Sequence, residues 1–137
     1  MAVRPTDHWR TGVAEEARAL AAGQLGPDEA FMSRLFPDSL LRRTDEVLAA
    51  FETELGALDV ASEAPSDARL LGAVRRVVLA LNAVNEEHGG AGYETDERER
   101  LCDYIDTALT EAGVDLDALT ARHGLGRHGI TDEWRDW

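Results

Sequence analysis

The sequence has few cysteines and no long apolar runs, and both features limit the classes of protein to which the chain can belong. Cys102 is the only cysteine, so no disulfide can form within the chain. Because Cys102 falls in an apolar helical stripe, we interpret it as a small buried hydrophobe, with a reactive thiol as the alternative. No apolar segment approaches the roughly 20 residues that cross a bilayer, and the start, Met-Ala-Val-Arg-Pro-Thr-Asp, lacks the apolar core of a signal peptide. We therefore expect a cytoplasmic protein that does not bind membranes.

Lysine is absent altogether. All 14 basic residues are arginine, and they stand against 27 aspartates and glutamates, which gives a formal net charge of −13. This charge repels phosphates, and no basic patch interrupts it, so nucleic acid is excluded as a direct partner. The charge suits solubility alone, or association with a basic protein. The exclusive use of arginine, with abundant alanine, leucine, glycine and aspartate, indicates a GC-rich coding sequence and hence a bacterial source.

The motifs of common enzyme and cofactor sites are also missing. The chain contains no GxxxxGK[ST], CxxC or GxSxG, so we assign no catalytic residue and no cofactor. No segment alternates apolar and polar residues as a strand does. A chain of 137 residues can bury a core as one domain. We expect a single all-α domain over residues 1–137: a bundle of about four main helices with shorter ones.

The strongest helical pattern begins at Leu70. Apolar residues recur there at spacings of three and four, at Leu70, Val74, Val77, Leu81 and Val84. Further apolar positions widen this stripe, as in a helix that is buried on several sides. The pattern predicts a central helix over about residues 66–88.

A glycine-rich break at residues 89–92 ends that helix. A second helix is predicted from Thr95 or Asp96 to about residue 112, with Asp96 and Glu99 in the spacing of a capping box. Two helices that are joined by a short connection fold back antiparallel. We therefore expect a helix hairpin.

The rest of the chain alternates shorter helical patterns with breaks. Helices are predicted over residues 13–22, 27–36, 38–58 and 115–122. Residues 59–67 read as a linker, and residues 1–12 as irregular, with His8 and Trp9 folded back onto the body. Residues 124–137 are expected to be flexible or docked.

Polar side chains gather around the predicted hairpin. The candidate binding residues are Asn82, Asn85, Glu86, His88, Tyr93, Glu94, Asp96 and Glu97. Carboxylates and a histidine at a hairpin can hold a divalent metal, for which Glu86, His88 and Glu94 are the candidate ligands. The residue three before His88 is asparagine, which departs from the Glu-x-x-His of diiron bundles. A solvated helix end, held by its asparagines, accounts for the same residues.

Asn82 stands inside an otherwise apolar run. A buried amide without hydrogen-bond partners is costly, so this side chain needs a specific partner. We expect it to bind the backbone of the loop between Gly90 and Glu94.

The C-terminal part holds two further candidate features. His123 and His128 could ligate one ion, or the glycines and arginines around them could accept an anion; a helix-terminating loop accounts for the same pattern. Trp134 and Trp137 lie with Ile130 at helical spacing, which predicts a short helix. Its tryptophans would either dock on the body or anchor an interface.

The hairpin segment also carries a resemblance. Leu-Asn-Ala-Val-Asn-Glu-Glu-His-Gly-Gly from Leu81, followed after Ala91-Gly92 by Tyr-Glu-Thr-Asp-Glu-Arg-Glu-Arg-Leu-Cys-Asp-Tyr-Ile, resembles segments of small uncharacterised all-helical bacterial proteins, some of them immunity-like. The resemblance covers residues 80–106, carries no established catalytic motif, and transfers no functional residue.

Three hypotheses remain open from the sequence. In the first, the carboxylate-rich hairpin between Glu86 and Glu99 covers a basic toxin or effector. In the second, the chain is a metal-binding protein or metal-dependent enzyme that uses the ligands named above. In the third, its helices complete a homodimer.

Overall fold

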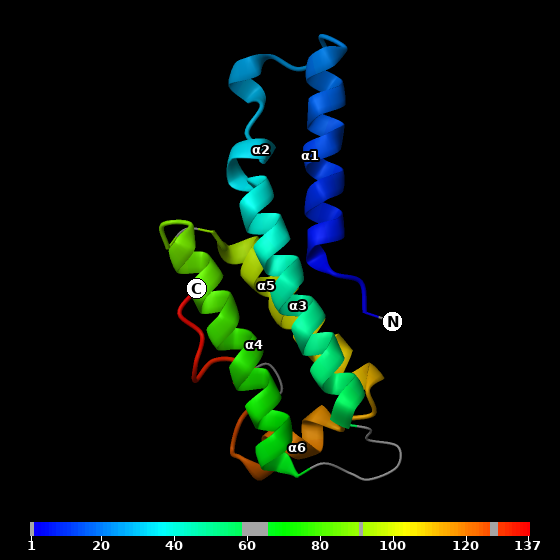
Figure 1. Ribbon diagram of the computed structural model, residues 1–137, viewed down its shortest axis with the longest axis vertical. Coiled ribbons are helices and arrows are strands. Elements are labelled where there is room, and N and C mark those ends of the chain that lie inside the picture. The colour runs from blue at the N-terminus through cyan, green and yellow to red at the C-terminus, as the bar shows by residue number, and fades with distance from the viewer. Residues whose placement is uncertain (1, 59–65, 91, 127–128) are drawn as a thin grey trace.

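The computed structural model describes residues 2–58, 66–90, 92–126 and 129–137. Its elements are α1 (Pro5–Ala21), the 3-10 helix η1 (Pro27–Glu29), α2 (Met32–Leu35), α3 (Asp38–Leu58), α4 (Asp67–Glu87), α5 (Thr95–Glu111) and α6 (Leu116–Arg122) (Figure 1). No strand occurs in the described ranges, which confirms the all-α prediction. Within the same ranges, no helix has the length and apolar character needed to cross a membrane. Most of the expected linker lies outside the described residues.

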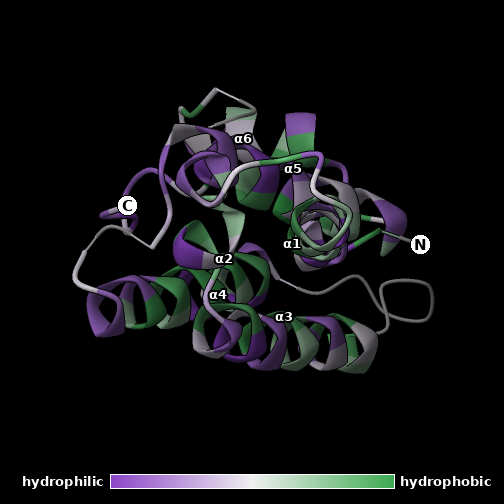
Figure 2. Ribbon diagram, turned by 90° about the horizontal axis from the view of Figure 1, so that it is seen from above, coloured by the Kyte–Doolittle hydropathy of each residue, from purple (hydrophilic) through white to green (hydrophobic). Residues whose placement is uncertain are grey.

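The helices form two layers, which are seen best from above (Figure 2). One layer consists of α3 and α4, which run antiparallel and make the closest helix pair (Figure 1). The other layer contains α1, α5 and α6, and α1 contacts both α3 and α5. The core between the layers is apolar, and its largest fully buried side chains include Trp9, Phe51, Leu48, Leu81, Leu101, Ile105, Leu109 and Leu119.

α3 and α4 follow the boundaries that their apolar spacing predicts. α3 spans residues 38–58 as expected, and α4 begins directly after Ser66, whose hydroxyl accepts the backbone N–H of Arg69 at 3.2 Å. α3 packs against both α4 and α1. The outer face of α4 leaves Leu79 41% exposed, while its other face is buried in the core. The apolar helix predicted near residues 66–88 is therefore present in the bundle as α4.

The first helix begins at Pro5 rather than at Val13. Arg4 is extended, and Pro5 takes the first helical position, where a missing N–H removes no hydrogen bond. The prediction that residues 1–12 are irregular is therefore wrong from Pro5 onward. Trp9 is 2% exposed and stacks on Phe36 with ring centroids 5.2 Å apart, which confirms that it packs on the body. His8 is exposed, so the same prediction is wrong for that residue.

A polar network fastens the start of α1 to the two neighbouring helices. The Arg4 guanidinium donates to the Glu52 carboxylate at 2.7 and 3.0 Å, and the Tyr104 hydroxyl donates to the same carboxylate. The Thr6 hydroxyl donates to Asp45 at 2.5 Å. The hydrogen bond from Arg4 holds the pKa of Glu52 below its usual value, while burial raises the pKa of Tyr104. The network links α1 to α3 and α5 in one place.

The helix predicted over residues 27–36 is broken in two. Ala30 has extended dihedral angles (φ −87°, ψ 111°), so η1 ends at Glu29 and α2 starts at Met32. The carboxylate of Glu16 on α1 accepts the backbone N–H groups of Phe31 at 3.1 Å and of Met32 at 2.9 Å. These donors are left without intrahelical partners at the start of a helix, so a distant residue caps α2.

α4 and α5 are joined by a short turn, but they do not pack side by side as the antiparallel helix hairpin that was predicted. α5 leaves the turn and crosses behind α3 into the second layer (Figure 1), while the closest neighbour of α4 is α3. The capping-box prediction for Asp96 and Glu99 is also wrong. The N-cap is Glu94, and its side chain makes no capping hydrogen bond.

Candidate functional site

The turn between α4 and α5 is held by Asn85. Its side-chain oxygen accepts the backbone N–H of Tyr93 at 3.0 Å, and its backbone carbonyl accepts the N–H of Gly90 at 2.9 Å. Gly89 and Gly90 have φ angles of 77° and 76°, a region that glycine enters without steric cost. Asn85 is only 3% exposed, so the buried amide of this region is Asn85 rather than Asn82.

Asn82 has a different partner from the one predicted. Its side-chain amide donates to the backbone carbonyl of Trp134 at 2.7 Å, and its oxygen accepts the backbone N–H of Asp136 at 3.2 Å. The prediction that Asn82 holds the loop at 90–94 is therefore wrong. Because the two asparagines are three residues apart on α4, neighbouring positions on one helix hold two separate segments.

The C-terminal tail is docked on the body, which is one of the two alternatives that the sequence left open. Trp134 and Trp137 are partly buried against the core, and the ring of Trp137 meets Tyr93 edge-on with centroids 5.5 Å apart. The Arg135 guanidinium lies 5.6 Å from the centroid of the Trp137 ring. The predicted helix from Ile130 is wrong, because the tail consists of turns and an irregular end. A role for these tryptophans in an interface stays a prediction.

His88 is engaged on both of its ring nitrogens. Nδ1 lies 2.8 Å from the backbone carbonyl of Val84, and Nε2 lies 2.9 Å from the hydroxyl of Ser39. Since a carbonyl can only accept, Nδ1 carries the hydrogen of the neutral ring, and Nε2 then accepts the Ser39 hydroxyl. His88 thus fixes the end of α4 to the start of α3. The sequence could not indicate this, because Ser39 is 49 residues away.

The three candidate metal ligands do not converge on one point. Glu86 and Glu94 are exposed, whereas His88 faces Ser39. Among the residues that the structure describes, no group of three or more histidine, cysteine, aspartate or glutamate side chains could hold an ion. The metal hypothesis therefore has no ligand set in this arrangement.

Tyr93 is buried in the core rather than offered to a ligand. It is 4% exposed, and its hydroxyl lies 2.5 Å from the hydroxyl of Thr44 on α3. Burial raises the pKa of Tyr93 to about 12. Its ring also packs on Trp9 at a centroid distance of 6.5 Å. Thr44 lies on the buried face of α3, and sequence reasoning missed it because threonine there resembles any small core residue.

The carboxylates around the turn fall into three groups. Glu87 accepts the Arg43 guanidinium at 3.1 Å, and Asp96 accepts Arg100 at 3.0 Å. Glu97 is 7% exposed and burial raises its pKa, so it is set apart from the exposed carboxylates by its burial, and its role as a binding residue stays a prediction. The remaining three, Glu86, Glu94 and Glu99, are exposed and make no ion pair with any described residue. We call these three residues the acidic end.

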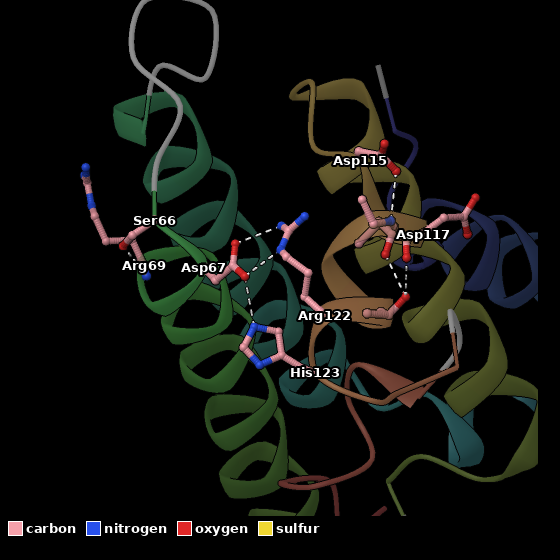
Figure 3. Close-up of polar contacts among 10 residues, drawn as sticks. Ser66, Asp67, Arg69, Asp115, Asp117, Arg122 and His123 are labelled. Atoms are coloured by element: carbon pink, nitrogen blue, oxygen red, sulfur yellow. Dashed lines mark hydrogen bonds and ion pairs between the residues drawn. The ribbon is translucent and has the colours of Figure 1, made fainter.

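A second polar cluster joins the start of α4 to the end of α6 (Figure 3). Asp67 accepts the Arg122 guanidinium through both carboxylate oxygens at 2.8 Å, and it lies 3.0 Å from Nε2 of His123. The Arg122 hydrogen bonds lower the pKa of Asp67 to about 2. Arg122 and His123 therefore both contact the carboxylate of Asp67 within this chain. The second histidine predicted for this site, His128, lies outside the described residues.

Comparison with known proteins assigns no family to this chain. No protein-family model, no curated protein and no solved structure matches the chain. The functional argument therefore rests on the residues described above.

Proposed function

We propose that this chain acts by protein–protein interaction, as an immunity-type inhibitor whose acidic end covers a basic surface of a toxin or effector. The observation that carries the proposal is the state of Glu86, Glu94 and Glu99. All three are exposed, on the end of α4, directly before α5 and within α5, and none forms an ion pair with a described arginine. Three uncompensated carboxylates attract a basic partner and raise its rate of association.

The hydrogen bonds on either side of the turn also support this proposal. The Asn85–Tyr93, Tyr93–Thr44 and His88–Ser39 hydrogen bonds attach the turn to α4 and α3. A surface that is already ordered loses little conformational entropy when it binds. The electrostatic attraction of the acidic end therefore contributes to affinity, because little of it is offset by the ordering of a loop.

A charge-reversal experiment tests the proposal. The triple variant Glu86→Lys, Glu94→Lys and Glu99→Lys is compared with a control that reverses Glu15, Asp28 and Glu29, three exposed acids near α1 and η1. Both variants change the net charge equally, so only the position of the charge differs. The probe is the product of the gene that neighbours this one, coexpressed in bacteria with each variant.

The expected result is that the wild type and the control restore growth, while the acidic-end variant does not. Binding of the purified proteins should weaken with added salt, since exposed charges are screened. Rescue by the acidic-end variant, or the absence of both toxicity and binding for the neighbouring product, would contradict the proposal.

A further inference from the structure

Glu97 is a carboxylate that is buried without a counter-ion. It lies in the first turn of α5, three residues after Glu94, and it is 7% exposed, so solvent still touches it. Six polar or charged residues are buried in the described chain, and Glu97 is the only one among them with a carboxylate. Acidic side chains are seldom buried to this degree unless a cation or several hydrogen bonds accompany them.

The described part of the chain supplies no such partner. The Glu97 carboxylate accepts its own backbone N–H, and it makes neither an ion pair nor a hydrogen bond with another described residue. Arg100 lies one turn further along α5, but its guanidinium donates to Asp96 at 3.0 Å. The one cation that is close in sequence is therefore engaged elsewhere.

This arrangement is unfavourable for the free protein. Burial raises the pKa of Glu97, and the negative charges of Asp96 and Glu94 raise it further. A carboxylate whose pKa is raised on folding destabilises the folded state once it is ionised. Residues that lower stability and lack a structural partner are concentrated at functional sites, where a ligand supplies the missing contact.

We propose that Glu97 receives an arginine side chain of the basic partner, whose guanidinium supplies the positive charge that the chain itself lacks there. Because this role rests on the function proposed above, the partner is the same basic protein. The acidic end attracts the partner's surface, and Glu97 then pairs with one of its side chains. Guanidinium is more weakly hydrated than ammonium and can bind a carboxylate through two parallel N–H groups, which favours arginine over lysine at a buried position.

A metal ion fits the same place less well. Divalent ions require several ligands, and in the described ranges no group of three or more acidic, histidine or cysteine side chains could provide them. A guanidinium requires only one carboxylate. The single buried acid thus matches an organic cation.

Titration with a basic peptide tests the proposal. Hexaarginine amide is added to the wild type, to Glu97→Gln and to Glu99→Gln, and hexalysine amide serves for comparison. Both variants remove one negative charge from α5, but Glu97 is buried and Glu99 is exposed. Glutamine keeps the shape of glutamate, so Glu97→Gln should stay folded by circular dichroism and unfold at a higher temperature than the wild type at neutral pH.

The expected result is about tenfold weaker binding of hexaarginine by Glu97→Gln and about twofold weaker binding by Glu99→Gln, because a buried charge pair contributes more than an exposed one. Hexalysine should distinguish the two variants less. In the wild type, the carboxyl ¹³C signal of Glu97 should shift when hexaarginine is added. Equal affinities of the two variants for hexaarginine, or a Glu97 signal that does not shift, would overturn the proposal.

Failure of this role differs from failure of the proposed function. The function is contradicted when the charge-reversal variant of the acidic end still restores growth. The role of Glu97 is contradicted when that variant fails to restore growth while Glu97→Gln binds hexaarginine as tightly as the wild type does.

Discussion

The side-chain oxygen of Asn85 lies 3.0 Å from the backbone nitrogen of Tyr93, and this hydrogen bond closes the turn between α4 and α5. Both residues are nearly inaccessible to solvent, so water cannot replace either partner. The bond also places the Tyr93 ring in the core, where it meets Trp9 and Trp137. One amide thus connects the geometry of the turn with the packing of three segments.

We expect Asn85→Ala to destabilise the protein by about 1–3 kcal/mol, because the buried N–H of Tyr93 would lose its acceptor. The loss should be local first. Amide exchange should accelerate in residues 89–90 and 92–94, and the free energy of unfolding from urea titration should fall. An unchanged exchange pattern in the turn would contradict the assignment of Asn85 as its anchor.

Asn82→Ala is the natural control for that variant. Asn82 lies three residues earlier on the same helix, but it binds the backbone of Trp134 and Asp136. We expect this variant to release the tail, with faster exchange after residue 129 and a red shift of tryptophan emission, while the turn stays protected. If both variants loosened the same segment, the two asparagines would not have the separate roles described here.

Asn85 has the role that the sequence predicts for Asn82, and this difference shows how far sequence patterns determine contacts. The spacing of apolar residues predicts α3 and α4 well, because each helix buries a face along its whole length. The same spacing says nothing about which segment from elsewhere in the chain covers a given polar position. Asn82 and Asn85 lie on one helix face, and only their distant partners distinguish them, the tail for Asn82 and the turn for Asn85.

The errors in the other elements have a related origin. Pro5 looks like an interruption in sequence, but it opens α1, since Arg4 enters the helix from an extended conformation. α2 starts at Met32 because Glu16 caps it across the chain, and no local motif encodes that contact. The partner of α4 was misjudged because short connections favour neighbours in sequence, whereas α3 and α4 bury a longer shared face.

The raised pKa of Tyr93 predicts a loss of stability in alkaline solution. Burial raises the pKa of Tyr93 to about 12 from its ordinary value of 10.0. As the pH rises above about 10, the unfolded chain releases the phenolic proton before the folded chain does, so unfolding becomes more favourable. The contribution of Tyr93 is fully present below pH 10 and is lost as the pH approaches 12.

Urea titrations of the wild type and of Tyr93→Phe across this range measure the effect. The variant has no phenolic proton at this position, so its stability should fall less steeply with pH. Tyr104→Phe provides a comparison, because burial also raises the pKa of Tyr104. Equal slopes for the wild type and Tyr93→Phe would show that Tyr93 is not buried as described.

Asp67 gives the opposite dependence, in acid. Its pKa falls from an ordinary 3.8 to about 2 in the folded state, mainly through the Arg122 hydrogen bonds. As the pH falls below 3.8, the unfolded chain takes up a proton before the folded chain, so the stabilisation by Asp67 disappears between about pH 4 and 2. We expect the free energy of unfolding to fall less steeply over this window in Asp67→Asn and in Arg122→Gln than in the wild type. The double variant should show the same slope as each single variant, without further flattening. Additive effects in urea titrations would mean that the two side chains act independently.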